Sequence, residues 1–421
     1  MEMSSMGSCE PATEKDMKSD PENAGPLKEI HVLDLADDKA SFCSKLLADL
    51  GARVIKIEKP GGDASRNPGP FRKNPPHPET NLSFRFNNAN KLGITLNIER
   101  RAGRDILLRL LKRTDILIET YPPGYLAGLG LGLEVLRGVN PRIILVSVTG
   151  FGQTGPHSTY KSCDLIAAAM GGQMYVTGDP LRPPLKPYGE QSYYTASLFG
   201  VISILLALRK RNMTGKGEHI DISLQEAVVS TLEHVMIRYF HDHVIAERQG
   251  SLYWNREFCI VPCKDGFMLV TLFQHWETLV GWMESEGMAD DLTDDAWTDE
   301  AYRLEHLDHI VEVVTRWAKA HTTGELFEIG QLMRFPWAPI QSPKDVLQSP
   351  QLKAREFLSP VQYPEIKTRV PCPNLPFGYS SLKLKSPGRT PLIGEHNAEV
   401  LQGELGLTDK DIERLRSEGI I

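Results

Sequence analysis

Two short apolar runs that flank one helical segment constrain the fold of this chain more than any other feature. Residues 30–35 (IHVLDL) are apolar enough for a strand buried on both faces. Residues 40–50 repeat apolar side chains at helical spacing, and Gly51 is a typical helix terminator. Residues 54–58 (VIKIE) form the next apolar run. This order predicts a βαβ unit with parallel strands and a right-handed connection.

The same alternation continues along the chain. The further segments expected are helices at 102–113, 133–139, 164–170, 192–211 and 224–239, and strands at 116–119, 143–148 and 219–223. Strands that alternate with helices are typical of an open parallel sheet. We therefore expect an α/β protein with a Rossmann-like large domain.

The length of 421 residues predicts more than one domain, because single cores stop growing near about 250–300 residues. Residues 1–26 are polar and rich in Ser, Glu, Asp and Pro, and we expect a disordered tail. Residues 27–224 are assigned to the large domain and 225–335, rich in aromatic and acidic residues, to a smaller α+β domain. Residues 336–421 are assigned to a Pro-rich linker and a C-terminal segment.

Charge and hydropathy narrow the classes of partner. The net charge of −7, with both signs mixed, argues against nucleic acid. No apolar run approaches the roughly 20 residues of a membrane span, and Leu198–Leu208 is expected to be a buried helix. Because the N-terminus has no apolar run of the secretory type, we expect a cytoplasmic protein with no membrane partner.

The six cysteines are irregularly spaced, which predicts neither a disulfide framework nor a zinc site. Cys259 and Cys263 (FCIVPC) are expected on one face of a strand as core thiols rather than as metal ligands. The loop after the first strand lacks G-x-G-x-x-G, and Asp37 and Asp38 would repel a pyrophosphate. We expect neither a metal nor a redox cofactor, and interpret Asp37 and Asp38 as helix N-caps.

Basic side chains gather after the second expected strand, among Gly, Pro and Asn. They are Lys56, Lys59, Arg66, Arg72, Lys73, Arg85 and Lys91. Such a loop suits a phosphorylated ligand. A solvated loop with scattered lysines explains the same pattern.

Glu190 stands between a Gly/Pro loop and the long apolar helix. A carboxylate at such a junction can face a cleft, and the helix dipole helps to keep it ionised. It can equally be an ordinary helix-start residue, which is the interpretation favoured for Asp164. No G-x-S-x-G, H-E-x-x-H or G-x-x-x-x-G-K-[ST] motif occurs.

From about residue 28 onward the chain resembles the class III CoA-transferases, which include formyl-CoA:oxalate, carnitine and bile-acid CoA-transferases. The motifs that carry the resemblance are LLADLGARVIKIEKPGGD (46–63), NNANKLGITLNI (87–98), NPRIILVSVTGFGQTGP (140–156), DLIAAAMGG (164–172), TGKGEHIDISLQEAV (214–228) and TPLIGEH (390–396). Six motifs in the family's order make a chance match implausible.

The resemblance implies a C-terminal segment that returns to the large domain, and a dimer of two interlocked ring-shaped chains. It also implies a reaction in which a carboxylate of the enzyme, usually Asp, attacks an acyl-CoA. A mixed anhydride and then an enzyme–CoA thioester form before an acceptor acid takes the CoA. CoA thioesters are substrates in this scheme, and no tightly bound cofactor is expected.

Carried over position by position, the nucleophile falls on Glu190, one methylene longer than the family's Asp. The cofactor-binding positions implied are Lys39, Ala40, Lys59, Lys91, Leu96, Tyr121 and Lys161. Three departures weaken this match: the first loop is acidic at Asp37 and Asp38, Ser41 and Phe42 replace a Gly-Pro turn, and Gly128 stands where an Arg often contacts CoA.

The racemase branch of the family has His at the position of Cys163, which argues against racemase activity. Residues 162–180 are most similar to the subunits of succinyl-CoA:(R)-benzylsuccinate CoA-transferases of anaerobic toluene degradation, especially the subunit without the usual Asp. Three hypotheses stay open: a supporting partner in a heterodimer with a paralogous Asp-bearing subunit, a homodimer that uses Glu190, and a non-enzymatic acyl-CoA-binding scaffold. Tyr253, Trp254 and Phe258 are expected either in an acyl pocket or in an aromatic core.

Overall fold

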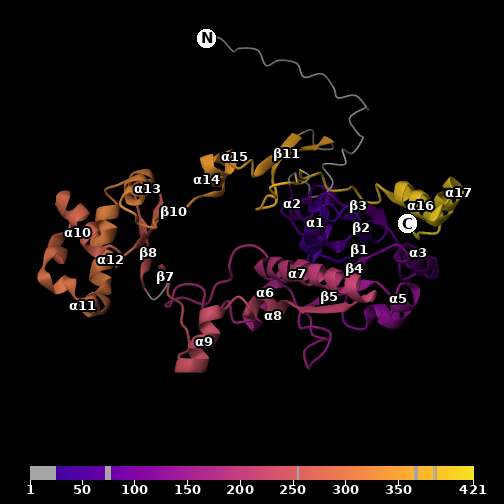
Figure 1. Cartoon of the computed structure of the whole chain (residues 1–421), viewed down its shortest axis with the longest axis horizontal. Helices are drawn as coiled ribbons and strands as arrows, with labels where there is room; N and C mark the ends of the chain where they lie inside the picture. The colour runs from indigo at the N-terminus through magenta and orange to yellow at the C-terminus, as the bar shows by residue number, and fades with distance from the viewer. Residues whose placement is uncertain (1–24, 72–76, 254–255, 365–367, 383, 385) are drawn as a thin grey trace, which may run out of the picture. The chain divides into compact units, whose positions relative to one another are not determined.

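The computed structural model describes residues 25–71, 77–253, 256–364, 368–382, 384 and 386–421 (Figure 1). The expected disordered tail therefore lies outside the described residues, apart from Gly25 and Pro26. The chain divides into two compact units. Among the described residues, unit 1 comprises those of 25–171, 188–231 and 356–421, and unit 2 comprises those of 172–187 and 232–355.

Unit 1 is built on a six-stranded parallel sheet. Its strands are β1 His31–Leu35, β2 Arg53–Glu58, β3 Leu92–Thr95, β4 Ile116–Glu119, β5 Ile144–Thr149 and β6 His219–Ser223. They lie in the order β3-β2-β1-β4-β5-β6, so Val32 of the central strand pairs with Val54 on one side and Ile116 on the other. This is the strand order of a doubly wound sheet, and it confirms the expected α/β fold.

Helices cover both faces of the sheet, because each strand sends apolar side chains to both sides. One face carries α1 Ser41–Asp49, α6 Asp164–Met170, α7 Gln191–Thr214 and α8 Leu224–Val229. The other carries α3 Arg101–Leu111, α4 Tyr125–Gly128, α5 Leu133–Val139, α16 Asn397–Leu405 and α17 Asp409–Ser417. Neighbouring residues of β4 show the division, since Ile116 and Ile118 belong to the first core and Leu117 to the second.

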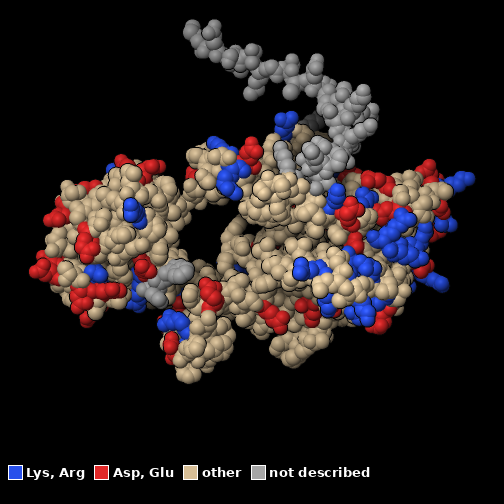
Figure 2. Space-filling model, viewed as in Figure 1, with Lys and Arg blue, Asp and Glu red and all other residues tan. Residues whose placement is uncertain are grey.

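Smaller elements complete unit 1. They are α2 Leu82–Asn87, the 3₁₀ turns Ala64–Arg66 and Pro78–Thr80, and the antiparallel strands β11 Leu358–Tyr363 and β12 Thr368–Pro373. On the face seen in Figure 2, Lys and Arg side chains gather over the part of unit 1 that contains α3 and α5.

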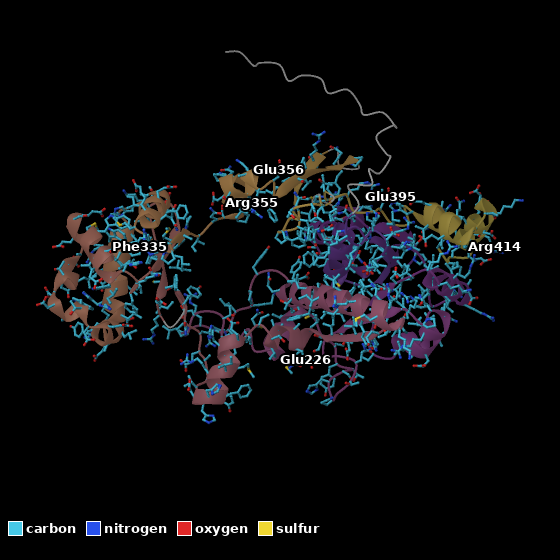
Figure 3. All side chains as sticks on the ribbon, in the orientation of Figure 1. Glu226, Phe335, Arg355, Glu356, Glu395 and Arg414 are labelled. Atoms are coloured by element: carbon cyan, nitrogen blue, oxygen red, sulfur yellow. The ribbon has the colours of Figure 1, made fainter. Side chains whose placement is uncertain are left out.

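The C-terminal segment returns to the large unit, as the resemblance implied. The Asn97 N–H donates to the Ile420 carbonyl at 2.7 Å, and the Thr95 N–H donates to Oδ1 of Asn397 at 2.8 Å. Glu395, labelled in Figure 3, pairs with Arg389 in the same segment. The bonds from Thr95 and Asn97 tie residues about 300 positions further along the chain to the end of the edge strand β3 and to the loop after it.

One described helix, α7, is long and apolar enough to cross a membrane by length and composition alone. In its most apolar window 44% of the helix is buried inside the protein. Val201 and Ile204 are buried, whereas Ile202 and Leu206 are 55% and 63% exposed. The expectation of a fully buried helix at Leu198–Leu208 is therefore wrong for one side of it.

The prediction of a single helix at 224–239 is also wrong. The structure has α8 and then α9 Glu233–Asp242, separated at 230–232. The Ser230 hydroxyl donates to the Glu226 carbonyl, and the Thr231 hydroxyl donates to the Val228 carbonyl. Such bonds from hydroxyls to the preceding turn compete with helix continuation.

Unit 2 has its own sheet and core. Its strands, in the order β10-β9-β8-β7, are β7 Leu252–Tyr253, β8 Phe258–Pro262, β9 Phe267–Thr271 and β10 Ala338–Pro339. Its helices are α9, α10 Trp276–Ser285, α11 Glu300–Glu305, α12 Leu307–Ala318, α13 Thr323–Leu332, α14 Pro343–Gln348 and α15 Pro350–Ala354, with 3₁₀ turns at Asp290–Thr293 and Asp295–Thr298. Trp282, Trp317 and Trp337 meet in the core, with Trp282 and Trp337 stacked 5.9 Å apart.

Unit 2 also contains residues 172–187, which the sequence placed in the large domain. Arg248 explains this, because its guanidinium donates to the carbonyls of Asp179 and Tyr175 at 3.2 and 3.1 Å. The Gly250 N–H adds a bond to the Gly178 carbonyl at 3.0 Å.

Candidate active site

A cavity of about 770 Å³ opens in unit 1 where the parallel strands end. Leu35, Glu58 and Thr149 line it from the carboxyl ends of β1, β2 and β5, and Thr120 follows β4 directly. Ligands of open α/β sheets bind at this edge, and the volume is that of a small-molecule site.

Five of the implied binding positions line this cavity: Lys39, Lys59, Leu96, Tyr121 and Lys161. They come from five separate segments, so the fold brings together residues 122 positions apart (161 − 39). Ala40 and Lys91 do not line the cavity; both are buried beside it.

The three cavity lysines differ in how their charges are used. Lys39 forms an ion pair with Asp37, and Lys59 pairs with Glu99 at 2.8 Å. Lys161 is exposed and has no ion pair or hydrogen bond within the described part of the chain. It is therefore the cavity cation best able to meet a phosphate group.

Lys91 is occupied inside the protein. Its Nζ atom donates to Asp34, to the Ser41 carbonyl and to Asn88 at 2.9, 2.9 and 2.7 Å. Burial lowers the pKa of Lys91 to about 8, although the Asp34 charge opposes that effect. Because all three ammonium hydrogens have acceptors, Lys91 holds the start of α1 in place.

Most of the predicted basic loop is structural in the same way. Arg66 is 1% exposed and makes two bonds to the Glu58 carboxylate at 2.6 and 2.7 Å. Lys56 is fully buried and lies 3.8 Å from Asp63. Arg72 and Lys73 lie outside the described residues.

The first loop carries acidic groups that do not cap the helix. Ala40 is the N-cap of α1, without a side-chain cap, so the N-cap interpretation of Asp37 and Asp38 is wrong. Asp37 instead accepts from the Lys39 N–H at 3.1 Å. Burial, followed by the charges of Glu190 and Asp37, raises the pKa of Asp38 to about 7. The loop that borders the cavity is therefore within electrostatic range of Glu190.

Glu190 is the N-cap residue of α7. Its carbonyl accepts from the N–H groups of Tyr193 and Tyr194 at 3.1 and 3.2 Å, while its carboxylate makes no capping bond. The residue is half-buried. The positive end of a helix this long favours the ionised form of a carboxylate there.

Asp164 caps a neighbouring helix rather than its own. The N-cap of α6 is Cys163, which has no side-chain cap. Oδ1 of Asp164 accepts from the N–H and hydroxyl of Ser192 at 2.9 and 2.7 Å, and the Asp164 N–H donates to the Tyr193 hydroxyl at 3.1 Å. The simple N-cap interpretation of Asp164 is wrong; the residue fastens α6 to the start of α7.

The Gly-rich loop after β5 packs closely against Ser162, which also lines the cavity. Gly150 lines the cavity, and a Cβ atom there would lie 2.3 Å from that of Ser162. The Gln153 N–H donates to the Asp221 carboxylate at 2.9 and 3.1 Å. That amide is therefore not available to a ligand.

The residues expected in an acyl pocket lie in unit 2. Tyr253 lines a second cavity of about 690 Å³, and Phe258 begins β8. Trp254 lies outside the described residues. Cys259 is buried in the core and Cys263 packs against it. Among the described residues no cluster of three or more His, Cys, Asp or Glu could hold a metal ion.

Sequence reasoning did not single out Tyr193, whose hydroxyl lies at the junction of α6 and α7. The available signal was its spacing of three residues from Glu190, which places both on the first helical turn.

Comparison with known families gives one match over most of the chain. The family described as CoA-transferase family III matches residues 27–397. Two similar proteins are named as subunits. The succinyl-CoA:(R)-benzylsuccinate CoA-transferase subunit BbsE of Thauera aromatica is 32% identical, over 93% of this chain and 97% of its own length. The succinyl-CoA–L-malate CoA-transferase beta subunit of Chloroflexus aurantiacus is also 32% identical, over 94% and 98%.

A human protein, succinyl-CoA:glutarate CoA-transferase, is 30% identical over 96% of this chain and 92% of its own. Among solved structures, a CAIB/BAIF family protein from Brucella suis superposes with a TM-score of 0.81. It is 29% identical, and the match covers 91% of this chain and all of that one.

Proposed function

The chain belongs to the class III CoA-transferase family, and we propose that it moves coenzyme A from succinyl-CoA to a dicarboxylic acid, with Glu190 as the nucleophile. The relatives support the donor, because benzylsuccinate, malate and glutarate transferases among them are all named for succinyl-CoA. Their named acceptors are dicarboxylic acids, and (R)-benzylsuccinate is one of the acceptors that we propose to test.

The observation that carries the proposal is the position of Glu190. It stands at the positive end of α7, and its charge acts on Asp38 in the loop that borders the cavity. Asp37 and Lys39, the two residues next to Asp38 in sequence, both line that cavity. A carboxylate so placed can meet an acyl group whose CoA portion lies in the cavity.

The reaction follows from what a carboxylate can do. An oxygen of Glu190 attacks the thioester carbonyl, the C–S bond breaks, and CoA leaves as thiolate. The thiolate attacks the Glu190 carbonyl of the mixed anhydride, which releases succinate and leaves a glutamyl-CoA thioester. The acceptor carboxylate attacks the Glu190 carbonyl of this thioester, the C–S bond breaks and a second mixed anhydride forms. The released thiolate then attacks the acceptor acyl carbon, which gives the acceptor CoA thioester and frees the Glu190 carboxylate.

No step in this scheme needs a metal or a redox group, and we propose that CoA thioesters are the only cofactor-like molecules involved. Lys161 supports the binding half of the scheme, because its uncompensated charge suits a phosphate of CoA. Activity that survives exhaustive chelation would agree with the proposal, and activity restored only by one divalent metal would contradict it.

A second candidate is a supporting subunit of a heterodimer whose Asp-bearing paralogue performs the chemistry. Two of the similar proteins are themselves named as subunits, which favours this alternative. Glu in place of Asp, and Gly128 in place of Arg, would then mark the less active site of the pair. In either case we propose that the working form is a dimer.

The test is CoA exchange by the purified chain, alone and with its paralogue. Succinyl-CoA is the donor, and malate, glutarate, mesaconate and (R)-benzylsuccinate are the acceptors. Exchange by the chain alone supports the first candidate, and exchange that appears only with the paralogue supports the second. If neither sample exchanges CoA with any acceptor, the proposed substrates are wrong.

A further inference from the structure

We propose that Tyr193 is a catalytic residue whose hydroxyl donates a hydrogen bond to the oxyanion formed when Glu190 attacks the acyl-CoA carbonyl. The inference rests on the proposed function and adds to it a residue of the reaction machinery. No motif of the sequence analysis includes Tyr193.

The backbone fixes Tyr193 close to the nucleophile. Its N–H donates to the Glu190 carbonyl at 3.1 Å, within the first turn of α7. Its ring packs, partly buried, against the core on that face of the sheet. The residue therefore sits on a rigid element rather than on a loop, which favours accurate positioning.

The hydroxyl is anchored from one side only. Its oxygen accepts from the Asp164 N–H at 3.1 Å, and Asp164 is itself held by Ser192. A phenol can accept one bond and donate another. Within the described part of the chain, no acceptor takes the hydrogen of the Tyr193 hydroxyl. The protein thus positions the Tyr193 hydroxyl, and its hydrogen is available to donate to a bound substrate.

The surroundings keep that hydrogen on the phenol. Burial raises the pKa of Tyr193 well above its ordinary value; the hydrogen bond from the Asp164 N–H opposes this shift, and the charges of Asp37 and Glu190 add to it. The partner of the hydroxyl, Asp164, lies two residues after Ser162, which lines the cavity. A phenol in this state donates a hydrogen bond and does not act as a base.

The developing charge needs such a donor. When the Glu190 oxygen bonds to the thioester carbon, the carbonyl oxygen gains the negative charge until the C–S bond breaks. The Gln153 amide of the nearby Gly-rich loop is taken by Asp221. The Tyr193 hydroxyl is available, keeps its proton throughout, and is returned unchanged when the thiolate leaves. Loss of one preorganised oxyanion donor typically lowers kcat about 10²–10³-fold.

The test compares Tyr193→Phe with Tyr194→Phe in whichever assembly, self or with the paralogue, exchanges CoA. Tyr194 is the matched control, because it is the next residue of the same helical turn and its ring packs edge-on against Phe42 at 4.9 Å. We expect kcat to fall about 10²-fold in Tyr193→Phe with KM changed less than about threefold. Tyr194→Phe should keep kcat within about threefold of wild type.

Site-specific 3-fluorotyrosine at position 193 separates chemistry from folding, because it keeps the hydroxyl and nearly the same shape. We expect it to retain most of the activity that Tyr193→Phe loses. Equal kcat for wild type and Tyr193→Phe would overturn the inference while leaving the proposed function intact. Equal loss in the phenylalanine and fluorotyrosine proteins would also overturn it. A wild-type protein without exchange in every assembly would overturn the proposed function and this inference together.

Discussion

Nζ of Lys91 lies 2.9 Å from Oδ2 of Asp34, and neither side chain is exposed to solvent. The pair joins β1 to the segment that precedes β3 and, through the Ser41 carbonyl, holds the start of α1. The first loop of the cavity thus rests on a buried ion pair.

Removal of one partner should therefore cost more than removal of both. Lys91→Met leaves the Asp34 carboxylate buried without its ion-pair partner, and we expect a loss of about 3–5 kcal/mol in unfolding free energy. The double variant Asp34→Asn/Lys91→Met should lose clearly less. Chemical denaturation followed by circular dichroism measures both.

Lys59→Met is the control for this experiment. Its partner Glu99 is half exposed, and an exposed ion pair contributes little to the free energy of unfolding. If Lys91→Met and Lys59→Met destabilise equally, the buried pair does not have the role assigned to it.

The raised pKa of Asp38 leads us to expect that the stability of the folded protein depends on pH. Its pKa is raised from 3.8 to about 7 by burial and by the charges of Glu190, Asp37 and Asp63, with Lys56 opposing. A raised pKa means that the folded state holds a proton which the unfolded chain releases. The contribution of Asp38 to the free energy of unfolding is therefore fully present below about pH 4, and it is lost as the pH rises through about 7.

Asp38→Asn removes this titration. We expect the variant to match wild type near pH 4 and to exceed it by about 1–3 kcal/mol at pH 8. Urea unfolding at both pH values is the measurement. Asp105→Asn, on the exposed side of α3, should show no such difference. A constant offset between Asp38→Asn and wild type at both pH values would contradict the assignment.

We expect that substitution of Lys161 weakens binding of the CoA thioester. Because its ammonium group has no partner among the described residues, Lys161→Ala removes a charge from the cavity without breaking an internal bond. We expect KM for the CoA thioester to rise about tenfold, the effect of about 1.4 kcal/mol, with kcat nearly unchanged.

Lys216→Ala removes a lysine of similar exposure outside the cavity and serves as the control. The effect of Lys161→Ala should also shrink at high salt, because exposed charge interactions are screened. An unchanged KM at low salt would remove Lys161 from the binding site.

Local periodicity was sufficient to predict much of unit 1 from sequence. The expected strand at 116–119 and the helices at 133–139 and 164–170 have the bounds of β4, α5 and α6. Each is fixed by apolar spacing within its own few residues. Tertiary contacts decide the rest, as at 172–187, where bonds from Arg248 draw the segment into unit 2.

The candidate site was predicted where a family motif carries a residue, and missed where packing decides its use. Lys39, Lys59, Tyr121 and Lys161 do line one cavity. Lys91 looked the same in sequence, but its burial and its three internal acceptors appear only in three dimensions.

The most direct test of the account is whether Glu190 itself becomes bonded to CoA. Incubation with succinyl-CoA followed by hydroxylamine or borohydride should modify Glu190 alone, as read by peptide mass spectrometry. Glu190→Gln should show no modification and should lose exchange by more than about 10³-fold. Unmodified Glu190 in an active sample, or a Glu190→Gln protein that retains most of its exchange in complex with the paralogue, would contradict the account.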